Sequence, residues 1–139
     1  ALSIDSDNPE YLFLQGKIAL KTADLASTIE SFKKVIEIDK FDIEGWYTLA
    51  YAYVLSGQES LAISVLKESI VSNTDESDLL CHLGAVLILS GQENEGLTYL
   101  GEGLLIDELD YDMFEFYPEV GENPKVKELI LKTSNKDNS

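Results

Sequence analysis

Arginine is absent from this sequence of 139 residues, and cysteine and histidine each occur once. A single cysteine, Cys81, cannot form an internal disulfide, and with only His82 beside it the chain has no ligand set for structural zinc. No apolar run approaches the roughly eighteen residues that a membrane-spanning helix needs. The sequence therefore predicts no cofactor, no metal and no membrane span, and stability is expected to come from packing.

Acidic residues outnumber basic ones by 26 to 10, which gives a net charge of -16, and every basic residue is lysine. Such a surface repels phosphate backbones and anionic lipids, and lysine lacks the planar fork with which arginine binds phosphate. Nucleic acid is therefore excluded as a partner, and a protein or peptide of basic or amphipathic character is expected instead. Residues 1–8 show no secretory signal, which leaves the compartment open with the cytoplasm as the default.

The five letters LSGQE occur at residues 55–59 and again at residues 89–93, thirty-four residues later. The same offset aligns small and large apolar residues in three successive segments: Gly16 with Ala50 and Gly84, and Leu12 with Trp46 and Leu80. In the middle segment Trp46, Leu49 and Tyr53 have the spacing of one helix face, and residues 62, 66 and 70 mark a second face. Each segment is therefore predicted to be a pair of amphipathic helices that approach most closely at the small residues.

The LSGQE sequence is predicted to be the turn inside each helix pair. Gly57 can adopt the left-handed conformation that ends the first helix, and Glu59 opens the second helix, where the helix dipole favours a carboxylate. The first segment has KTAD at residues 21–24 and no glycine there. Its turn must be closed differently, with Asp24 as the expected cap of its second helix.

A set of spaced residues in the middle segment carries a family resemblance: Trp46-x2-Leu49-Ala50-x2-Tyr53, then Gly57, then Ala62-x3-Leu66. This set resembles the tetratricopeptide repeat. The resemblance implies an all-α fold, a right-handed α-solenoid of helix-turn-helix repeats with a C-terminal capping helix. It also implies that the chain is the C-terminal part of a longer repeat protein.

The phase of the repeat divides the chain into six predicted segments: the end of a preceding repeat at 1–8, repeats at 9–42, 43–76 and 77–110, a partial fourth repeat and capping helix at 111–132, and a disordered tail at 133–139. Pro118 stands where Ala50 stands in the second repeat and is predicted to stop the fourth. Pro124 suits the first turn of the capping helix. Three apolar residues of that helix are expected to cover the end of the stack: Val126, Leu129 and Ile130.

In the family that this chain resembles, the first helix of each repeat lines a concave groove. The resemblance places twelve residues there: Phe13, Lys17, Leu20 and Lys21 in the first repeat, Tyr47, Tyr51, Val54 and Leu55 in the second, and Cys81, Ala85, Ile88 and Leu89 in the third. It implies a non-catalytic protein–protein interaction scaffold that binds a peptide or a helix in this groove. The alternative is a structural or self-association segment that forms a homodimer or packs on upstream repeats of the parent protein.

Other interpretations of the same residues stay open. The groove side chains can instead pack on neighbouring repeats or on the C-terminal segment, and the acidic loops either form a negative ridge for a basic partner or cap and solvate helix starts. Lys17 and Lys21 are either solvated or attract an acidic residue of a ligand. Cys81 and the half-buried His82 expected beside it point about 100° apart on a helix, so they form no nucleophile–base pair and no enzyme is expected.

Overall fold

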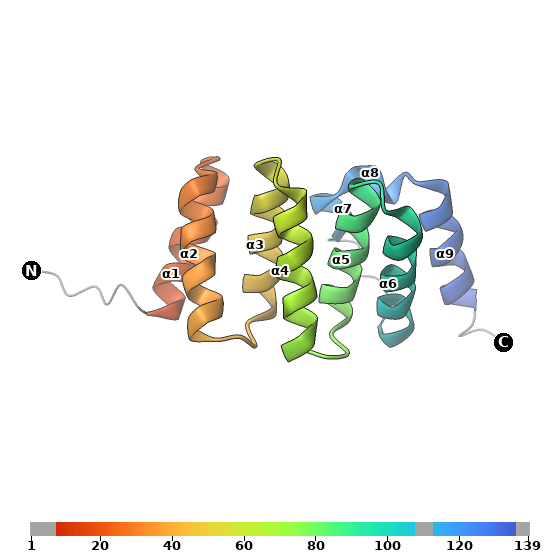
Figure 1. The fold of residues 1–139 in the computed structure, drawn as a ribbon, viewed down its shortest axis with the longest axis horizontal. Helices are drawn as coiled ribbons and strands as arrows, with labels where there is room; N and C mark the ends of the chain where they lie inside the picture. The colour runs from red at the N-terminus through yellow and green to blue at the C-terminus, as the bar shows by residue number, and fades with distance from the viewer. Residues whose placement is uncertain (1–7, 108–112, 136–139) are drawn as a thin grey trace, which may run out of the picture. The chain divides into compact units, whose positions relative to one another are not determined.

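The computed structural model of the chain describes residues 8–107 and 113–135, and in these two ranges every regular element is a helix. Figure 1 shows them in chain order: α1 (Pro9–Lys21), α2 (Leu25–Ile38), α3 (Ile43–Leu55), α4 (Glu59–Ser72), α5 (Ser77–Leu89), α6 (Glu93–Ile106), α7 (Met113–Phe116), α8 (Pro118–Gly121) and α9 (Pro124–Asn135). The predicted all-α fold of helix-turn-helix repeats is confirmed. Apart from Asn8, the predicted end of a preceding repeat lies outside the described residues.

The helices recur with one period. The first helices of the three pairs begin at residues 9, 43 and 77, and the second helices begin at residues 25, 59 and 93, so that both series have the spacing of the LSGQE copies. Helix lengths alternate between 13 and 14 residues throughout the three pairs. The repeat length seen in the amino-acid sequence is therefore also the repeat length of the helices in the structure.

The chain packs as two compact units, residues 1–65 (unit 1) and residues 66–139 (unit 2). In unit 1, α1 pairs with α2, and α2 packs on α3. Trp46 is only 4% exposed, and its Nε1–H donates to the Lys40 carbonyl over 2.7 Å. Gly16 lies against Phe32, since a Cβ at Gly16 would stand 2.5 Å from Phe32 Cε2. The small residue predicted at the closest approach of the first pair is thus where the helices meet.

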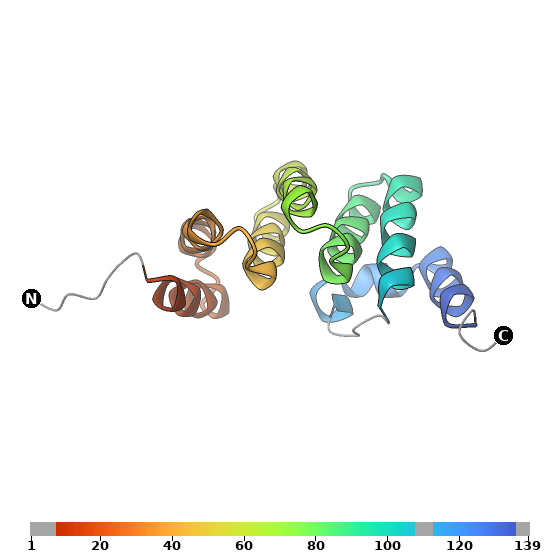
Figure 2. The same cartoon turned by 90° about the horizontal axis from the view of Figure 1, so that it is seen from below.

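In unit 2, α5 and α6 form the tightest pair, and Figures 1 and 2 show them side by side with α9 along α6. A Cβ at Gly84 would stand 2.6 Å from the Gly96 carbonyl oxygen, and a Cβ at Gly96 would stand 2.6 Å from the Gly84 carbonyl oxygen. Glycine on both helices therefore lets the two backbones touch. Every residue of α5 from Leu79 to Leu87 is buried.

The three turns inside the helix pairs have one geometry. Ala23, Gly57 and Gly91 occupy the same position with φ of 60°, 80° and 92°. The amide after each donates to the carbonyl five residues earlier over 2.8 to 2.9 Å, which is the closing bond of a helix C-terminus of this type. In the first turn alanine takes the left-handed conformation that glycine takes in the other two, at a cost in backbone strain.

Side chains complete these turns locally. In the first LSGQE copy Ser56 Oγ donates to the Tyr53 carbonyl and Gln58 Nε2 donates to Ser56 Oγ, both over 2.9 Å. Ser90 and Gln92 repeat both bonds in the second copy. The first turn uses Asp24 instead, which accepts from the Ser27 amide over 3.2 Å as the N-cap of α2, as predicted. Hydrogen bonds from Ser27 lower the pKa of Asp24.

The C-terminal segment departs from the repeat at the predicted proline. α7 ends at Phe116, and Pro118 opens α8 in its first turn, where the missing N–H leaves no bond unmade. Pro124 likewise opens α9, whose Val126 is fully buried. The predicted disordered tail is wrong for residues 133–135, which belong to α9. The Thr133 hydroxyl donates to the carbonyls of Leu129 and Ile130 in the same helix. Residues 136–139 lie outside the described part.

Candidate interaction surfaces

In unit 1, two groove residues of α1 are engaged within the protein. The ring of Phe13 stands edge-on to that of Phe32 on α2, with 5.3 Å between centroids. Lys17 Nζ lies 3.3 Å from Glu44 Oε2 on α3 and 5.4 Å from the centre of the Phe13 ring. Lys17, which the sequence left as either solvated or available to an acidic residue of a ligand, therefore pairs with Glu44 of the same chain. Because both side chains of the pair are exposed, this bridge contributes at most about 1 kcal/mol.

The rest of the predicted set in unit 1 lies at or near the surface. On α1, Leu20 is half-buried and Lys21 is exposed. On α3, Tyr47, Tyr51 and Val54 are half-buried, while Leu55 is 49% exposed. This part of α3 thus presents two aromatic rings and two aliphatic side chains, all partly open to solvent, on one helix.

In unit 2 the predicted groove is different. Cys81 and Ala85 are buried, so the prediction that they line an open groove is wrong, while Ile88 and Leu89 are half-buried. A Cβ at Gly103 would stand 2.6 Å from Cys81 Sγ, and a Cβ at Gly96 would stand 2.7 Å from Ile88 Cγ1. These side chains fill the space that the glycines of α6 leave inside the α5–α6 pair. The sequence held a signal for this packing in Gly96 and Gly103, because a helix without side chains at these positions can be approached closely by another element.

The C-terminal segment also covers α5. Helices α7 and α8 both contact α5. The ring of His82 lies 5.4 Å from that of Phe116 and 5.5 Å from that of Tyr117. His82 is 3% exposed instead of half-buried as expected, because the later aromatic residues enclose it. This packing on the C-terminal segment is the alternative that the sequence left open for the third repeat.

The chemistry of Cys81 and His82 is set by this burial. Burial raises the pKa of the Cys81 thiol to about 12, against a smaller lowering effect of a hydrogen bond with Ser77, and the charge of Asp78 raises it slightly further. Burial lowers the pKa of His82 to about 3. At neutral pH the Cys81 thiol keeps its proton and the His82 imidazole is uncharged. The two neighbouring residues therefore provide neither a thiolate nor an imidazolium.

Within residues 8–107 and 113–135, no three His, Cys, Asp or Glu side chains come together as ligands for a metal ion. None of the helices in those same ranges is long and apolar enough to cross a membrane.

Two acids of the loop between α2 and α3 make local hydrogen bonds. Asp42 is the N-cap of α3 and accepts from the Gly45 amide over 2.9 Å. Asp39, the C-cap of α2, accepts from the Phe41 amide over 3.0 Å inside the loop. Asp42 therefore follows the capping interpretation of the acidic loops, and Asp39 stabilises the loop itself.

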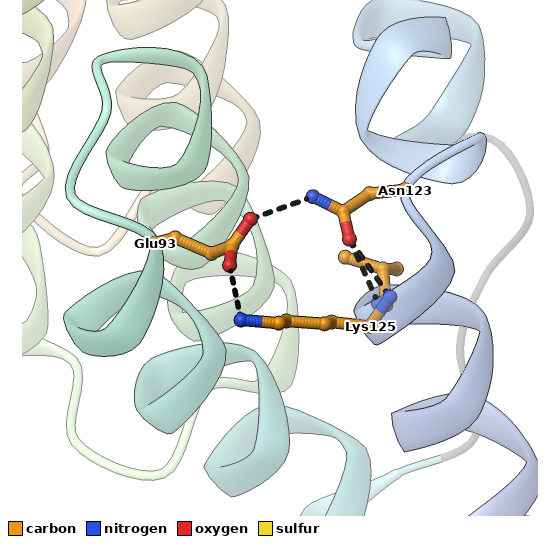
Figure 3. A network of polar contacts seen from close by, with 4 residues as sticks. Glu93, Asn123 and Lys125 are labelled. Atoms are coloured by element: carbon orange, nitrogen blue, oxygen red, sulfur yellow. Dashed lines mark hydrogen bonds and ion pairs between the residues drawn. The ribbon is translucent and has the colours of Figure 1, made fainter.

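A polar cluster joins α6 to α9 in unit 2, as Figure 3 shows. Glu93, in the first turn of α6, accepts from Asn123 Nδ2 over 3.1 Å and lies 2.9 Å from Lys125 Nζ. Asn123 also caps α9, since its Oδ1 accepts from the Lys125 amide over 2.8 Å and from the Val126 amide over 3.4 Å. Hydrogen bonds from Lys125 and Asn123 lower the pKa of the Glu93 carboxyl group. One asparagine thus begins α9 and attaches it to α6.

Residues 9–42 match the family model of the tetratricopeptide repeat. The chain therefore contains a tetratricopeptide repeat and has the fold of that family. The match covers α1 and α2 with the boundaries predicted for the first repeat, although the resemblance was drawn mainly from the second. The repeat and its fold support a protein-interaction scaffold as the class of function.

Among solved structures the tetratricopeptide fold of this chain is similar to the crystal structure of MamA. The TM-score is 0.70 at 23% sequence identity, and the alignment covers 96% of this chain and 81% of the MamA chain. At this level of identity the similarity concerns the fold alone. No curated protein sequence matches the chain.

Proposed function

We propose that the chain is a non-catalytic scaffold that binds a peptide or a helix of another protein on the α1 and α3 surface of unit 1. The observation that carries the proposal is the solvent exposure that apolar side chains of α3 keep although α2 packs on this helix. Tyr47, Tyr51 and Val54 remain half-buried and Leu55 remains 49% exposed. Aromatic residues in such positions are common anchors of protein interfaces because they supply large contact area with few rotatable bonds.

The chemistry of the partner follows from the same surface. Its apolar side chains favour a ligand with apolar residues at helical or extended spacing. The net charge of -16 favours basic residues elsewhere in that ligand, because the field of the chain increases their rate of encounter. An amphipathic segment with a basic polar face meets both conditions.

A peptide selection tests this proposal. A phage-displayed library of random twelve-residue peptides is selected on the full chain, and the affinities of the selected peptides are compared by fluorescence polarisation. Replacing an interface anchor by alanine typically costs about 2 kcal/mol, so Tyr51→Ala is expected to weaken binding roughly thirtyfold. The control Lys33→Ala, on an exposed position of α2, should leave affinity unchanged. Selected peptides that bind Tyr47→Ala and Tyr51→Ala as tightly as the wild type would refute the proposal.

A second candidate is self-association, or packing on further repeats, through the α1–α2 pair. Two observations favour it: Leu14 and Ile18 are 59% and 55% exposed, and a surface hollow of about 450 Å³ includes Leu12, Ile18 and Ala19 in its lining. Light scattering at micromolar concentration separates the two candidates. A dimer that Ile18→Asp makes monomeric, and that Tyr51→Ala leaves intact, would support this second function.

A further inference from the structure

One face of α1 is exposed, although the same face is buried in the other first helices of the repeat. Leu14 and Ile18, which we name the open face of α1, are 59% and 55% exposed. Thr48 of α3, thirty-four residues after Leu14, is 3% exposed. Ala52 and Val86, which follow Ile18 by one and two repeat lengths, are fully buried. The open face is therefore a surface that the rest of the chain covers.

The interface between α2 and α3 shows what covers this face within the chain. Gly45, Thr48 and Ala52 lie at i, i+3 and i+7, on one face of α3, and α2 packs on α3. A Cβ at Gly45 would stand 3.1 Å from Val35 Cγ1 and 3.3 Å from Ile36 Cγ2 of α2. The second helix of one repeat thus supplies branched aliphatic side chains to the first helix of the next.

A hollow of about 450 Å³ borders the open face, and its apolar lining comes from α1: Leu12, Ile18 and Ala19. The polar residues that line it are engaged within unit 1. Lys34 Nζ lies 3.6 Å from Glu30 Oε1, and Asp24 is the N-cap of α2. Gln15 Nε2 donates to the Tyr11 hydroxyl over 2.7 Å. Apolar contact, and not charge, therefore decides what fits here.

Tyr11 sets a requirement on the size of one residue in the occupant. Tyr11 precedes Gly45 by thirty-four residues, so α1 has a large side chain where α3 has none. A helix that packs on α1 as α2 packs on α3 must therefore have a small residue in the place of Val35. The sequence has small residues at both positions one repeat length from Val35: Ser69 after it and Ala1 before it.

We propose that the open face of α1 binds the second helix of a further tetratricopeptide repeat, placed ahead of residue 9 in the same array. Apolar side chains of that helix cover Leu14 and Ile18, and its small residue lies against Tyr11. This inference rests on the second candidate function and names its occupant. A repeat helix is favoured over a second copy of the chain because the α2–α3 interface covers the equivalent face in that way.

A ten-residue extension tests the proposal and keeps the full chain. A copy of residues 59–68, the first part of α4, is joined ahead of residue 1, so that residues 1–4 stand where residues 69–72 complete α4. Amide hydrogen exchange at residues 14–18 should become at least about tenfold slower than in the original chain. Burial of one isoleucine side chain changes an opening equilibrium by about this factor or more.

A second extension, copied from residues 25–34 of α2, makes the test independent of one donor helix and should give the same result. Ile18→Asp locates the contact. Its effect on exchange should be small in the original chain, where this side chain is exposed, but in either extended chain it buries a carboxylate and should cancel the slowing. The matched control is Val71→Asp, which replaces an apolar side chain that is 79% exposed. It should leave exchange in α1 unchanged in every chain.

Three results would overturn the proposal. One is exchange in α1 that neither extension slows, and another is slowing that Ile18→Asp leaves intact. The third is an original chain that dimerises by light scattering and becomes monomeric in Ile18→Asp, because a second copy is then the occupant and only the self-association form of the second candidate stands. The function proposed for the α1 and α3 surface is tested separately, by peptides whose binding depends on Tyr51.

Discussion

Gly84→Ala adds one methyl group at the place where the backbones of α5 and α6 touch. The new Cβ would stand 2.6 Å from the Gly96 carbonyl oxygen, 2.7 Å from the Leu100 amide nitrogen and 2.9 Å from Leu100 Cβ. Two of these atoms belong to a helix backbone, which cannot move out of the way by a rotamer change. The helices must therefore separate by roughly 1 Å, a gap that forfeits a quarter to a half of each affected dispersion contact.

The net effect on stability follows from two opposing contributions. Alanine improves helix propensity over glycine by about 1 kcal/mol. Overpacking a tight helix contact costs about 3 kcal/mol at the upper end of its usual range, which applies because backbone is struck. Gly84→Ala is therefore expected to lower the free energy of unfolding by about 2 kcal/mol. Urea denaturation followed by far-UV circular dichroism measures this as a lower midpoint at unchanged slope.

Gly101→Ala is the matched control, because it makes the same change on the partner helix of the same pair. Its Cβ would meet Leu129 at 3.7 Å and no nearer atom, so the helix-propensity gain is not opposed. A rise in the free energy of unfolding by about 0.5 to 1 kcal/mol is expected. If Gly84→Ala were as stable as the wild type, the close approach of α5 and α6 would be wrong. If Gly101→Ala were destabilised, the space described beside Gly101, with Leu129 at ordinary contact distance, would be wrong.

Three further predictions concern the turns, the buried imidazole and the last helix. Ala23→Gly should stabilise the protein by about 0.5 to 1 kcal/mol in urea denaturation by relieving the left-handed strain at φ of 60°, and Gly57→Ala should destabilise it by a similar amount. The folded pKa of His82, about 3, lies below the unfolded value near 6.5, so stability is complete above pH 6.5 and falls as the unfolded state takes up a proton. The loss should reach about 2 kcal/mol at pH 5, and His82→Phe should remove it from urea midpoints measured between pH 7.5 and 5, whereas an unchanged pH profile would contradict the burial. Asn123→Ala should cost about 1 kcal/mol and speed amide hydrogen exchange in α9, and Lys125→Gln should do less, since it leaves the cap in place.

The helix pairs and their turns were predictable because their causes are local. Trp46 and the residues spaced from it mark a helix face, and the positive φ of Gly57 ends that helix through bonds made within six residues. Asp24 shows the same locality, since a capping carboxylate needs only the amides that follow it. Each of these features was predicted from a window no longer than a helix turn or two.

The surface residues were predicted less well because their exposure depends on distant segments. Helix spacing places Cys81 on a face, but the face is closed by Gly103 on α6, and α5 is further covered by α7 and α8. His82 is enclosed by rings more than thirty residues later in the chain. A repeat pattern assigns equivalent positions to equivalent faces. It does not show that the segment after α6, with α7 and α8, packs over α5.

The two copies of LSGQE show the difference between local interactions and contacts with distant segments. Their serines and glutamines make the same hydrogen bonds, because the partners are inside the turn. Their glutamates stand at the same helix start, yet Glu93 also binds Asn123 and Lys125, which α9 brings to it. Identical local sequence thus gives an identical turn, while the use of its last residue is decided by what packs beside it. Since α9 is attached to α6 through that glutamate, the packing of the C-terminal segment of unit 2 depends on tertiary contacts that the repeat alone does not encode.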